Sequence, residues 1–156
     1  MDEIRREQIL GEAYFLRAYQ YFDAAISWGN VPIILEPLED YYVPNNTTDE
    51  VWAQVESDLK EAIDRLPEKS EWPANQVGRA TKGAATALLG KAYLYQKKYD
   101  LAETTLKTVA ESPEYSLDPE FANVWSLEGE NGSGSLFELN FAELGEDDVS
   151  NAEGNF

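Results

Sequence analysis

Hydrophobic residues recur at helical spacing in four stretches of the chain. The first stretch, residues 3–28, is apolar around nearly its whole circumference. Its apolar residues are Ile9, Leu10, Ala13, Tyr14, Phe15, Leu16, Ala18, Tyr19, Tyr21, Phe22, Ala25 and Ile26. A helix that is apolar on most sides is typical of a buried element, so we expect this helix to be enclosed by the core. Gly29 and Asn30 follow it, and both residue types accept the left-handed turn that ends a helix.

A second helix is predicted over residues 48–66. Thr47 and Glu50 have the spacing of a capping box, in which each residue's side chain binds the other's backbone N–H. A single apolar stripe follows at helical period. Its members are Val51, Val55, Leu59, Ala62 and Leu66. Pro67 then ends the helix.

Two shorter helices follow, over residues 81–98 and about 100–111. The first is rich in small residues, which would let a neighbouring helix approach closely: Gly83, Ala84, Ala85, Ala87, Gly90 and Ala92. Tyr99 and Asp100 are expected to form a short turn. Asp100 and Glu103 have the spacing of an N-cap, so the pattern predicts that Asp100 caps the last helix.

The segments between and after these helices differ in character. Residues 31–37 contain two prolines and should be extended, and residues 36–47 and 67–80 read as loops. Residues 135–141 alternate in part between polar and apolar side chains, which predicts a short strand or extended segment. Residues 142–156 are acidic and carry too little apolar surface to order themselves, so we expect a disordered or truncated tail.

The helices contain an internal repeat. Leu-Gly-Glu-Ala-Tyr at residues 10–14 returns as Leu-Gly-Lys-Ala-Tyr at residues 89–93, which is 79 positions later. In the second helices, residues 58–62 resemble residues 105–109, at an offset of 47. Small residues at helix contacts and large ones between pairs are typical of tetratricopeptide-like (TPR-like) repeats. We therefore predict an all-α fold with two TPR-like helix pairs, 3–66 and 81–112.

Composition and charge exclude several functions. The chain of 156 residues has a net charge of −18, which disfavours binding to nucleic acids and to anionic lipid surfaces. It contains no cysteine and no histidine, so ordinary zinc sites, disulfides and histidine-based triads are excluded. We expect no cofactor and no metal site. The chain has neither a transmembrane-length apolar run nor the apolar core of a signal peptide, so a signal for export would have to lie outside it.

Two long motifs resemble one known family. Residues 15–22 read FLRAYQYF and residues 28–32 read WGNVP, while residues 78–95 read GRATKGAATALLGKAYLY. Both segments, in this order, resemble the hallmarks of the SusD/RagB family of outer-membrane nutrient-binding lipoproteins. Residues 135–141, SLFELNF, resemble a third family segment. The resemblance covers nearly the whole chain and suggests an internal fragment, with residues 1–141 forming part of a SusD-like domain.

The resemblance implies a function without catalysis. Members of the family hold oligosaccharides at the cell surface for a SusC-like TonB-dependent transporter, and their helical repeats form the scaffold that packs against it. It therefore implies a surface-exposed outer-membrane lipoprotein, a glycan or other nutrient as ligand, and no enzymatic activity. The alternative from the repeat alone is a TPR-like module that binds a protein or peptide. An enzyme such as a glycosidase would need two carboxylates facing each other across a cleft.

Five aromatic residues are the candidate ligand contacts, because the apolar face of a sugar can stack on an aromatic ring. They are Trp28, Tyr41, Tyr42, Trp72 and Trp125. The alternative is that these rings fill junctions between helices and loops. Arg17 lies in an otherwise apolar helix, where it needs a carboxylate or carbonyl partner, and Arg79 and Lys82 are expected to make structural hydrogen bonds.

Overall fold

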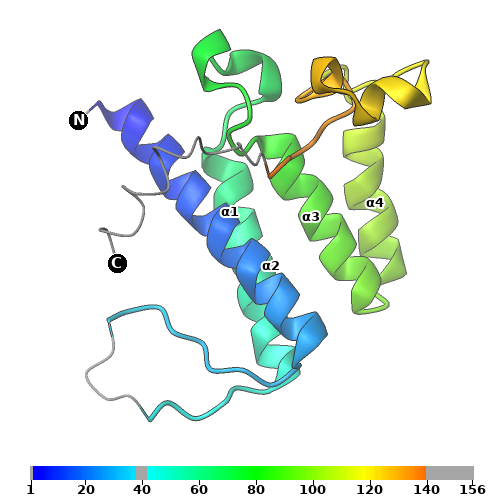
Figure 1. The fold of residues 1–156 in the computed structure, drawn as a ribbon. Helices are drawn as coiled ribbons and strands as arrows, with labels where there is room; N and C mark the ends of the chain where they lie inside the picture. Colours follow the sequence, from blue (N-terminus) through cyan, green and yellow to red (C-terminus); the bar gives the residue numbers. More distant parts are fainter. Residues whose placement is uncertain (1, 38–41, 140–156) are drawn as a thin grey trace, which may run out of the picture.

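A computed structural model of the chain describes residues 2–37 and 42–139. Over these residues the fold is all-α, with four helices and four short 3-10 helices, and no strand is present. The helices are α1 (Glu3–Ser27), α2 (Thr48–Arg65), α3 (Lys82–Tyr95) and α4 (Tyr99–Ala110), and the 3-10 helices are η1 (Lys69–Glu71), η2 (Ala74–Gln76), η3 (Phe121–Trp125) and η4 (Leu127–Gly129). Consecutive helices run antiparallel (Figure 1), and each packs mainly on its neighbours in the sequence. The predicted all-α, TPR-like fold is confirmed.

Local signals set the ends of α1 and α2 as predicted. Gly29 has a φ of +70°, so the left-handed turn after α1 falls on the residue that tolerates it best. The capping box of α2 is complete. The Thr47 N–H donates to Glu50 Oε2 at 2.8 Å, and the Glu50 N–H donates to Thr47 Oγ1 at 3.3 Å.

The turn between α3 and α4 differs from the prediction. Helix α3 ends at Tyr95 because Lys97 takes a left-handed conformation, with a φ of +61°. The carbonyl of Lys98 then accepts the first bond of α4, from the Ala102 N–H at 2.9 Å. Lys98 is therefore the N-cap, and Asp100 lies in the first helical turn. The predicted cap at Asp100 is wrong, because the turn closes two residues earlier.

The core lies along the middle of the helix stack. All five residues of the predicted α2 stripe are buried, together with Phe15, Ala18, Phe22 and Ala25 of α1. Helix α1 is not enclosed on most sides, however, since Ile9, Leu16 and Ile26 are exposed. The reason is that α1 packs mainly on α2 and touches α3 only slightly, so its outer face has no neighbour among the described residues.

The two helix pairs contain the same kind of contact between their helices, a glycine against a leucine. A Cβ added to Gly11 would lie 3.0 Å from Leu66 Cγ, and one added to Gly90 would lie 2.5 Å from Leu106 Cγ. Leu66 is thus the structural counterpart of Leu106, and Ala62 that of Ala102. The second helices therefore align at an offset of 40, and the predicted offset of 47 is wrong.

The segment after η4 returns to the helices. Residues 137–139 form neither helix nor strand and follow a bend at Leu136. The Phe137 ring packs edge-on against Phe15, with ring centroids 4.9 Å apart, and against Tyr19 at 6.0 Å. Residues 135–141 were predicted to form a short strand or extended segment, and no strand forms in the described part, residues 135–139. The predicted tail, residues 142–156, lies outside the described residues.

Candidate functional site

The connection between α1 and α2, residues 28–47, carries three of the predicted ligand contacts, two of which lie among the described residues. Trp28 caps the C-terminus of α1 with its side chain in solvent, at 75% exposure, and Tyr42 is 92% exposed. Both belong to the connection at the lower end of the molecule in Figure 1. Tyr41 lies outside the described residues. This end of the molecule therefore presents aromatic rings that no core packing requires.

The base of this connection is held by hydrogen bonds. The Asn46 N–H donates to the Val31 carbonyl at 3.0 Å, and Asn46 Oδ1 accepts from the Ile33 N–H at 2.9 Å. The Tyr21 hydroxyl of α1 accepts from the Ile34 N–H at 2.7 Å. The connection thus leaves the helices in a fixed direction, which positions the residues beside Trp28.

Trp72 lies elsewhere and is buried. Its side chain is 8% exposed, and its indole N–H donates to the Ala80 carbonyl at 3.0 Å. The Arg79 guanidinium lies over the ring, 5.3 Å from its centroid. Because so little of the ring reaches solvent, Trp72 fills the junction before α3, and its predicted stacking on a ligand has no open ring face.

Trp125 lies at the opposite end from Trp28. It belongs to η3, at the top of Figure 1, and is 78% exposed. Phe121 stands beside it, with ring centroids 6.2 Å apart in an edge-on arrangement. Phe121 was not among the predicted contacts. A second aromatic residue four positions before Trp125 could have indicated that the two rings lie together. The five predicted aromatic contacts therefore do not form one row.

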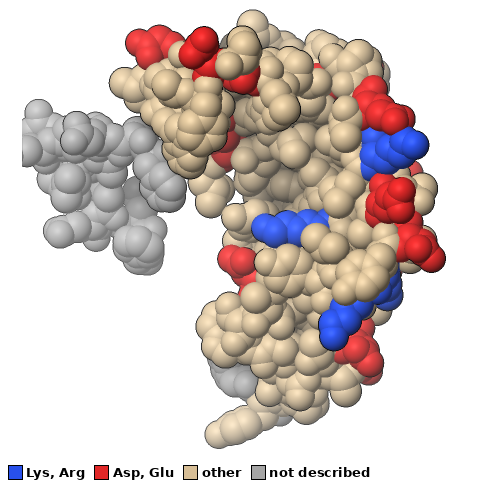
Figure 2. Space-filling model, turned by 90° about the vertical axis from the view of Figure 1, so that its right-hand side faces the viewer, with Lys and Arg blue, Asp and Glu red and all other residues tan. Residues whose placement is uncertain are grey.

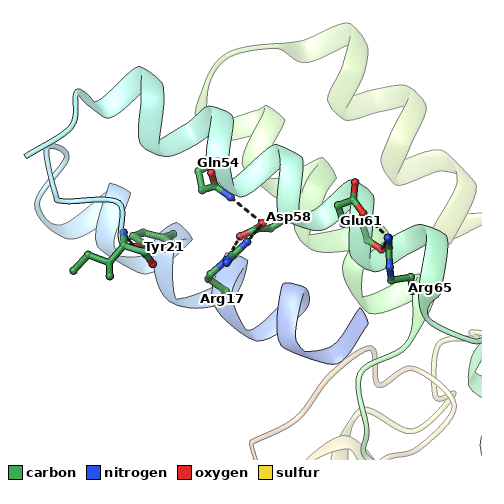
Figure 3. A network of polar contacts seen from close by, with 7 residues as sticks. Arg17, Tyr21, Gln54, Asp58, Glu61 and Arg65 are labelled. Carbon is green, nitrogen blue, oxygen red and sulfur yellow. Dashed lines mark hydrogen bonds and ion pairs between the residues drawn. The ribbon is translucent and has the colours of Figure 1, made fainter. Parts of the chain in front are cut away.

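A partly buried ion pair joins α1 to α2. Arg17 donates to Asp58 through Nε at 2.7 Å and through Nη2 at 2.6 Å, and Gln54 Nε2 donates to the same carboxylate at 2.9 Å. Figure 3 shows the three side chains converging between the two helices. The hydrogen bond to Asp58 raises the pKa of the Arg17 guanidinium above its ordinary value. The predicted structural ion pair of Arg17 is confirmed.

A second forked pair fixes the loop before α3. Arg79 donates to both carboxylate oxygens of Glu12, at 2.6 and 2.5 Å, and this bond raises the pKa of Arg79. Lys82 pairs with Glu68 at 3.6 Å. Arg79 therefore makes the structural hydrogen bonds that were expected of it, whereas the Lys82 side chain has an ion pair with Glu68 that is too long for a hydrogen bond.

The most enclosed cavity lies beside this loop and is small. It has a volume of about 180 Å³ and is lined partly by Lys69, Arg79, Thr81 and Phe137. Its described lining includes two cations and no carboxylate, which is not the lining that glycoside hydrolysis requires. Within residues 2–37 and 42–139, no group of three or more carboxylates is placed to hold a metal ion.

Comparison with known proteins identifies relatives. A SusD-like family model, described as starch-binding associating with outer membrane, matches residues 1–94. A SusD-like protein of Formosa agariphila is 33% identical over 114 residues, which make up 70% of this chain and 22% of that protein. One of Bacteroides ovatus is 28% identical and is matched over 94% of this chain and 28% of its own length.

Solved structures agree with these matches. A laminarin binding SusD-like protein has 36% sequence identity and a TM-score of 0.82, over 88% of this chain and 31% of that one. Surface glycan-binding protein A from Bacteroides uniformis has 32% identity and a TM-score of 0.82, over 90% of this chain and 32% of that one. The chain spans about a quarter of the length of the curated relatives it matches. Because the family model covers more than half of the sequence and relatives share its fold, the chain belongs to the SusD-like family and corresponds to one part of its longer members.

Proposed function

We propose that the polypeptide carrying this chain is a non-catalytic glycan-binding protein of a SusC/SusD-type uptake system. It captures an oligosaccharide at the outer-membrane surface, where a lipid anchor holds it, and passes the oligosaccharide to a TonB-dependent transporter. The observation that carries the proposal for this chain is the exposed indole of Trp28 beside a connection whose base is fixed. The names of the similar structures, laminarin binding and surface glycan-binding, describe the same kind of activity.

The chemistry of this end of the molecule suits a sugar. An aromatic ring offers a flat apolar face for the axial hydrogens of a pyranose, and neighbouring polar groups take its hydroxyls. Tyr42 and Asn45 belong to the same connection and are exposed. Since the connection is held by Asn46 and Tyr21, less conformational freedom is lost when a ligand binds, which favours affinity.

Calorimetric titration of the full-length protein with laminarin and with starch tests the proposal. Trp28→Ala should weaken binding of the preferred glycan about tenfold, which corresponds to ~1.4 kcal/mol. Trp125→Ala is the control, because it removes from the opposite end an indole that is about as exposed in this chain; we expect unchanged affinity at a temperature where both variants are folded. Binding that is unaffected by Trp28→Ala, or the absence of binding to both glycans, would contradict the proposal.

The transporter partnership is tested separately. The full-length protein, tagged and extracted from outer membranes in mild detergent, should co-purify with a TonB-dependent transporter in a fixed ratio. We expect retention of the tagged protein in the membrane fraction to depend on its lipid anchor or on the transporter. None of the helices in the described part of the chain could span a membrane. A tagged protein recovered entirely without the transporter contradicts this part of the proposal and leaves the glycan result unchanged.

A further inference from the structure

The segment that contains η3 and η4 forms a loop closed at its base. The Ser116 N–H donates to the Ser133 carbonyl at 3.1 Å, and the Ser133 hydroxyl donates to the Ser116 carbonyl at 3.2 Å. Lys69 Nζ donates to the carbonyls of Gly132 and Ser135, at 2.6 and 3.0 Å. Burial lowers the pKa of Lys69 below its ordinary 10.5, in keeping with a cation enclosed by this base. The loop thus has a defined conformation where it leaves the helices.

The tip of the same loop is apolar and exposed. Five large apolar side chains lie in solvent within eleven residues: Leu117, Phe121, Val124, Trp125 and Leu127. Soluble proteins rarely leave such a cluster uncovered unless it is an interface. Both 3-10 helices are also too short to be stable without packing, and among the described elements η3 packs mainly on η4. A lasting contact would supply the missing burial.

The rim of this tip is uniformly acidic. Asp118, Glu120, Glu128 and Glu130 flank the apolar residues, and the sequence contains no Lys or Arg after Lys107. On the face turned to the viewer in Figure 2, carboxylates lie along the upper edge, and the Lys and Arg side chains lie lower, at the centre and at the right edge beside further carboxylates. An anionic lipid surface or a polyanion would be repelled here. A polypeptide surface with an apolar recess and a Lys or Arg rim is complementary to this tip.

The aliphatic residues decide between a glycan and a protein as the covering surface. A sugar uses flat aromatic faces, and Leu117 and Leu127 offer none, although they are among the most exposed apolar residues of the chain. The curated relatives are roughly three times as long as this chain. We infer that the apolar tip of residues 117–127 is an internal docking surface, covered by a basic-rimmed surface in the part of the polypeptide outside this chain. This inference does not depend on the glycan-binding proposal.

Thiol labelling of the full-length protein tests whether the tip is covered. Leu127→Cys is treated with a maleimide in the native and the urea-unfolded protein, and the labelled peptide is quantified by mass spectrometry. We expect native labelling at least about tenfold slower than unfolded labelling, because the thiol would react only after the interface opens. Equal rates overturn the inference, and so does protection that arises only when a transporter or membrane is added, since the covering surface would then belong to another molecule.

Charge reversal tests the chemistry of the covering surface. Glu128→Lys combined with Glu130→Lys should lower the melting temperature of the full-length protein by about 3 °C or more, and high salt should shrink the difference. Asp64→Lys combined with Glu103→Lys changes the charge equally at two exposed helix positions, and we expect no comparable loss. If the variant with Glu128→Lys and Glu130→Lys has the same melting temperature as this control, the covering surface has no basic rim and the inference is contradicted.

Discussion

The two helix pairs use the same contact with different connections. In each pair a glycine of the first helix faces a leucine of the second, Gly11 with Leu66 and Gly90 with Leu106. The contacting residues are 55 positions apart in the first pair and 16 in the second. Only three residues separate α3 from α4, whereas residues 28–47 separate α1 from α2. Figure 1 shows the longer helices extending past the shorter pair at this end.

The pairs also differ in what holds the helices in register. The α3–α4 pair relies on the close approach of small residues, such as Gly90 and Ala102, and on a tight turn. The α1–α2 pair has no tight turn, and its middle contains the ion pair of Arg17 with Asp58. A polar contact within a long apolar interface allows only one register. We infer that the Arg17–Asp58 ion pair sets the register of α1 against α2, whereas the short turn sets the register of α3 against α4.

The largest effect should follow from removal of Asp58. Asp58→Ala leaves Arg17 beside an apolar interface without its partner, and loss of one member of a buried pair costs about 3–5 kcal/mol. Because the Arg17 side chain is 32% exposed, water can solvate part of the freed charge, so we expect about 2–3 kcal/mol in urea denaturation. Ser57→Ala, at an exposed neighbouring position, should change little. A cost for Asp58→Ala below that of the Gly90 variant described next would refute the register role.

Gly90→Ala and Gly11→Ala compare the two contacts directly. The added methyl at Gly90 meets Leu106 Cγ at 2.5 Å, whereas the methyl at Gly11 meets its neighbours at 3.0 Å or more. We expect Gly90→Ala to cost about 1–2 kcal/mol through overpacking. Gly11→Ala should fall within about 0.5 kcal/mol of wild type, since the gain in helix propensity offsets its milder crowding.

A double variant isolates the crowding in the second pair. Leu106→Ala removes the side chain that the new methyl would meet, so Gly90→Ala should be less harmful in that background. Thermal unfolding of the four proteins in the cycle gives the coupling free energy. Additive effects of the two substitutions would show that the methyl at position 90 is crowded by something other than Leu106.

Features that depend on neighbouring residues were predicted more accurately than features that depend on contacts between distant segments. The ends of α1 and α2 were predicted well because Gly29 and the capping box of Thr47 with Glu50 act within a few residues. The register of the repeat was not, because Leu59 and Leu66 are seven residues apart and so lie on the same helix face, two turns from each other. Periodicity cannot choose between them. Only the close approach to Gly11 does so.

Residues of the candidate site were harder to predict for a similar reason. The sequence around a loop tryptophan is the same whether its ring is exposed or buried. The carbonyl that accepts the hydrogen bond of the Trp72 indole belongs to Ala80, eight residues later. That Arg17 needed a partner was predictable, but the identity of Asp58 was not, since the two residues are 41 positions apart. Exposure depends on how distant segments pack, and the hydrophobic pattern alone does not encode that packing.

The N-caps of α2 and α4 also differ, and we expect this difference to have a smaller effect on the free energy of unfolding. Helix α2 has a complete capping box. The N-cap residue of α4, Lys98, makes no capping hydrogen bond with its side chain. Thr47→Ala should therefore cost about 1 kcal/mol in urea denaturation. Lys98→Ala should cost about 0.5 kcal/mol at most, because it loses a partly exposed pair with Glu56 and a distant contact of the ammonium with the Tyr93 ring. Equal costs would mean that the box does not contribute beyond an ordinary surface contact.

The smallest effect concerns the dependence of this cap on pH. The Glu50 carboxylate accepts hydrogen bonds from the Thr47 N–H and hydroxyl, and these bonds lower the pKa of Glu50 below its ordinary value of 4.5. A lowered folded-state pKa contributes stability above the unfolded-state value, and this contribution is lost as the pH falls from 4.5 through the folded-state pKa. Glu50→Gln cannot titrate, so the gap between its unfolding free energy and that of wild type should narrow as the solution is acidified. Ser57→Ala, at an exposed position of α2, serves as the control because it alters no titratable group. Its curve should run nearly parallel to the wild-type curve, and a parallel curve for Glu50→Gln as well would mean that the box is held by the Thr47 hydroxyl rather than by the charge of Glu50.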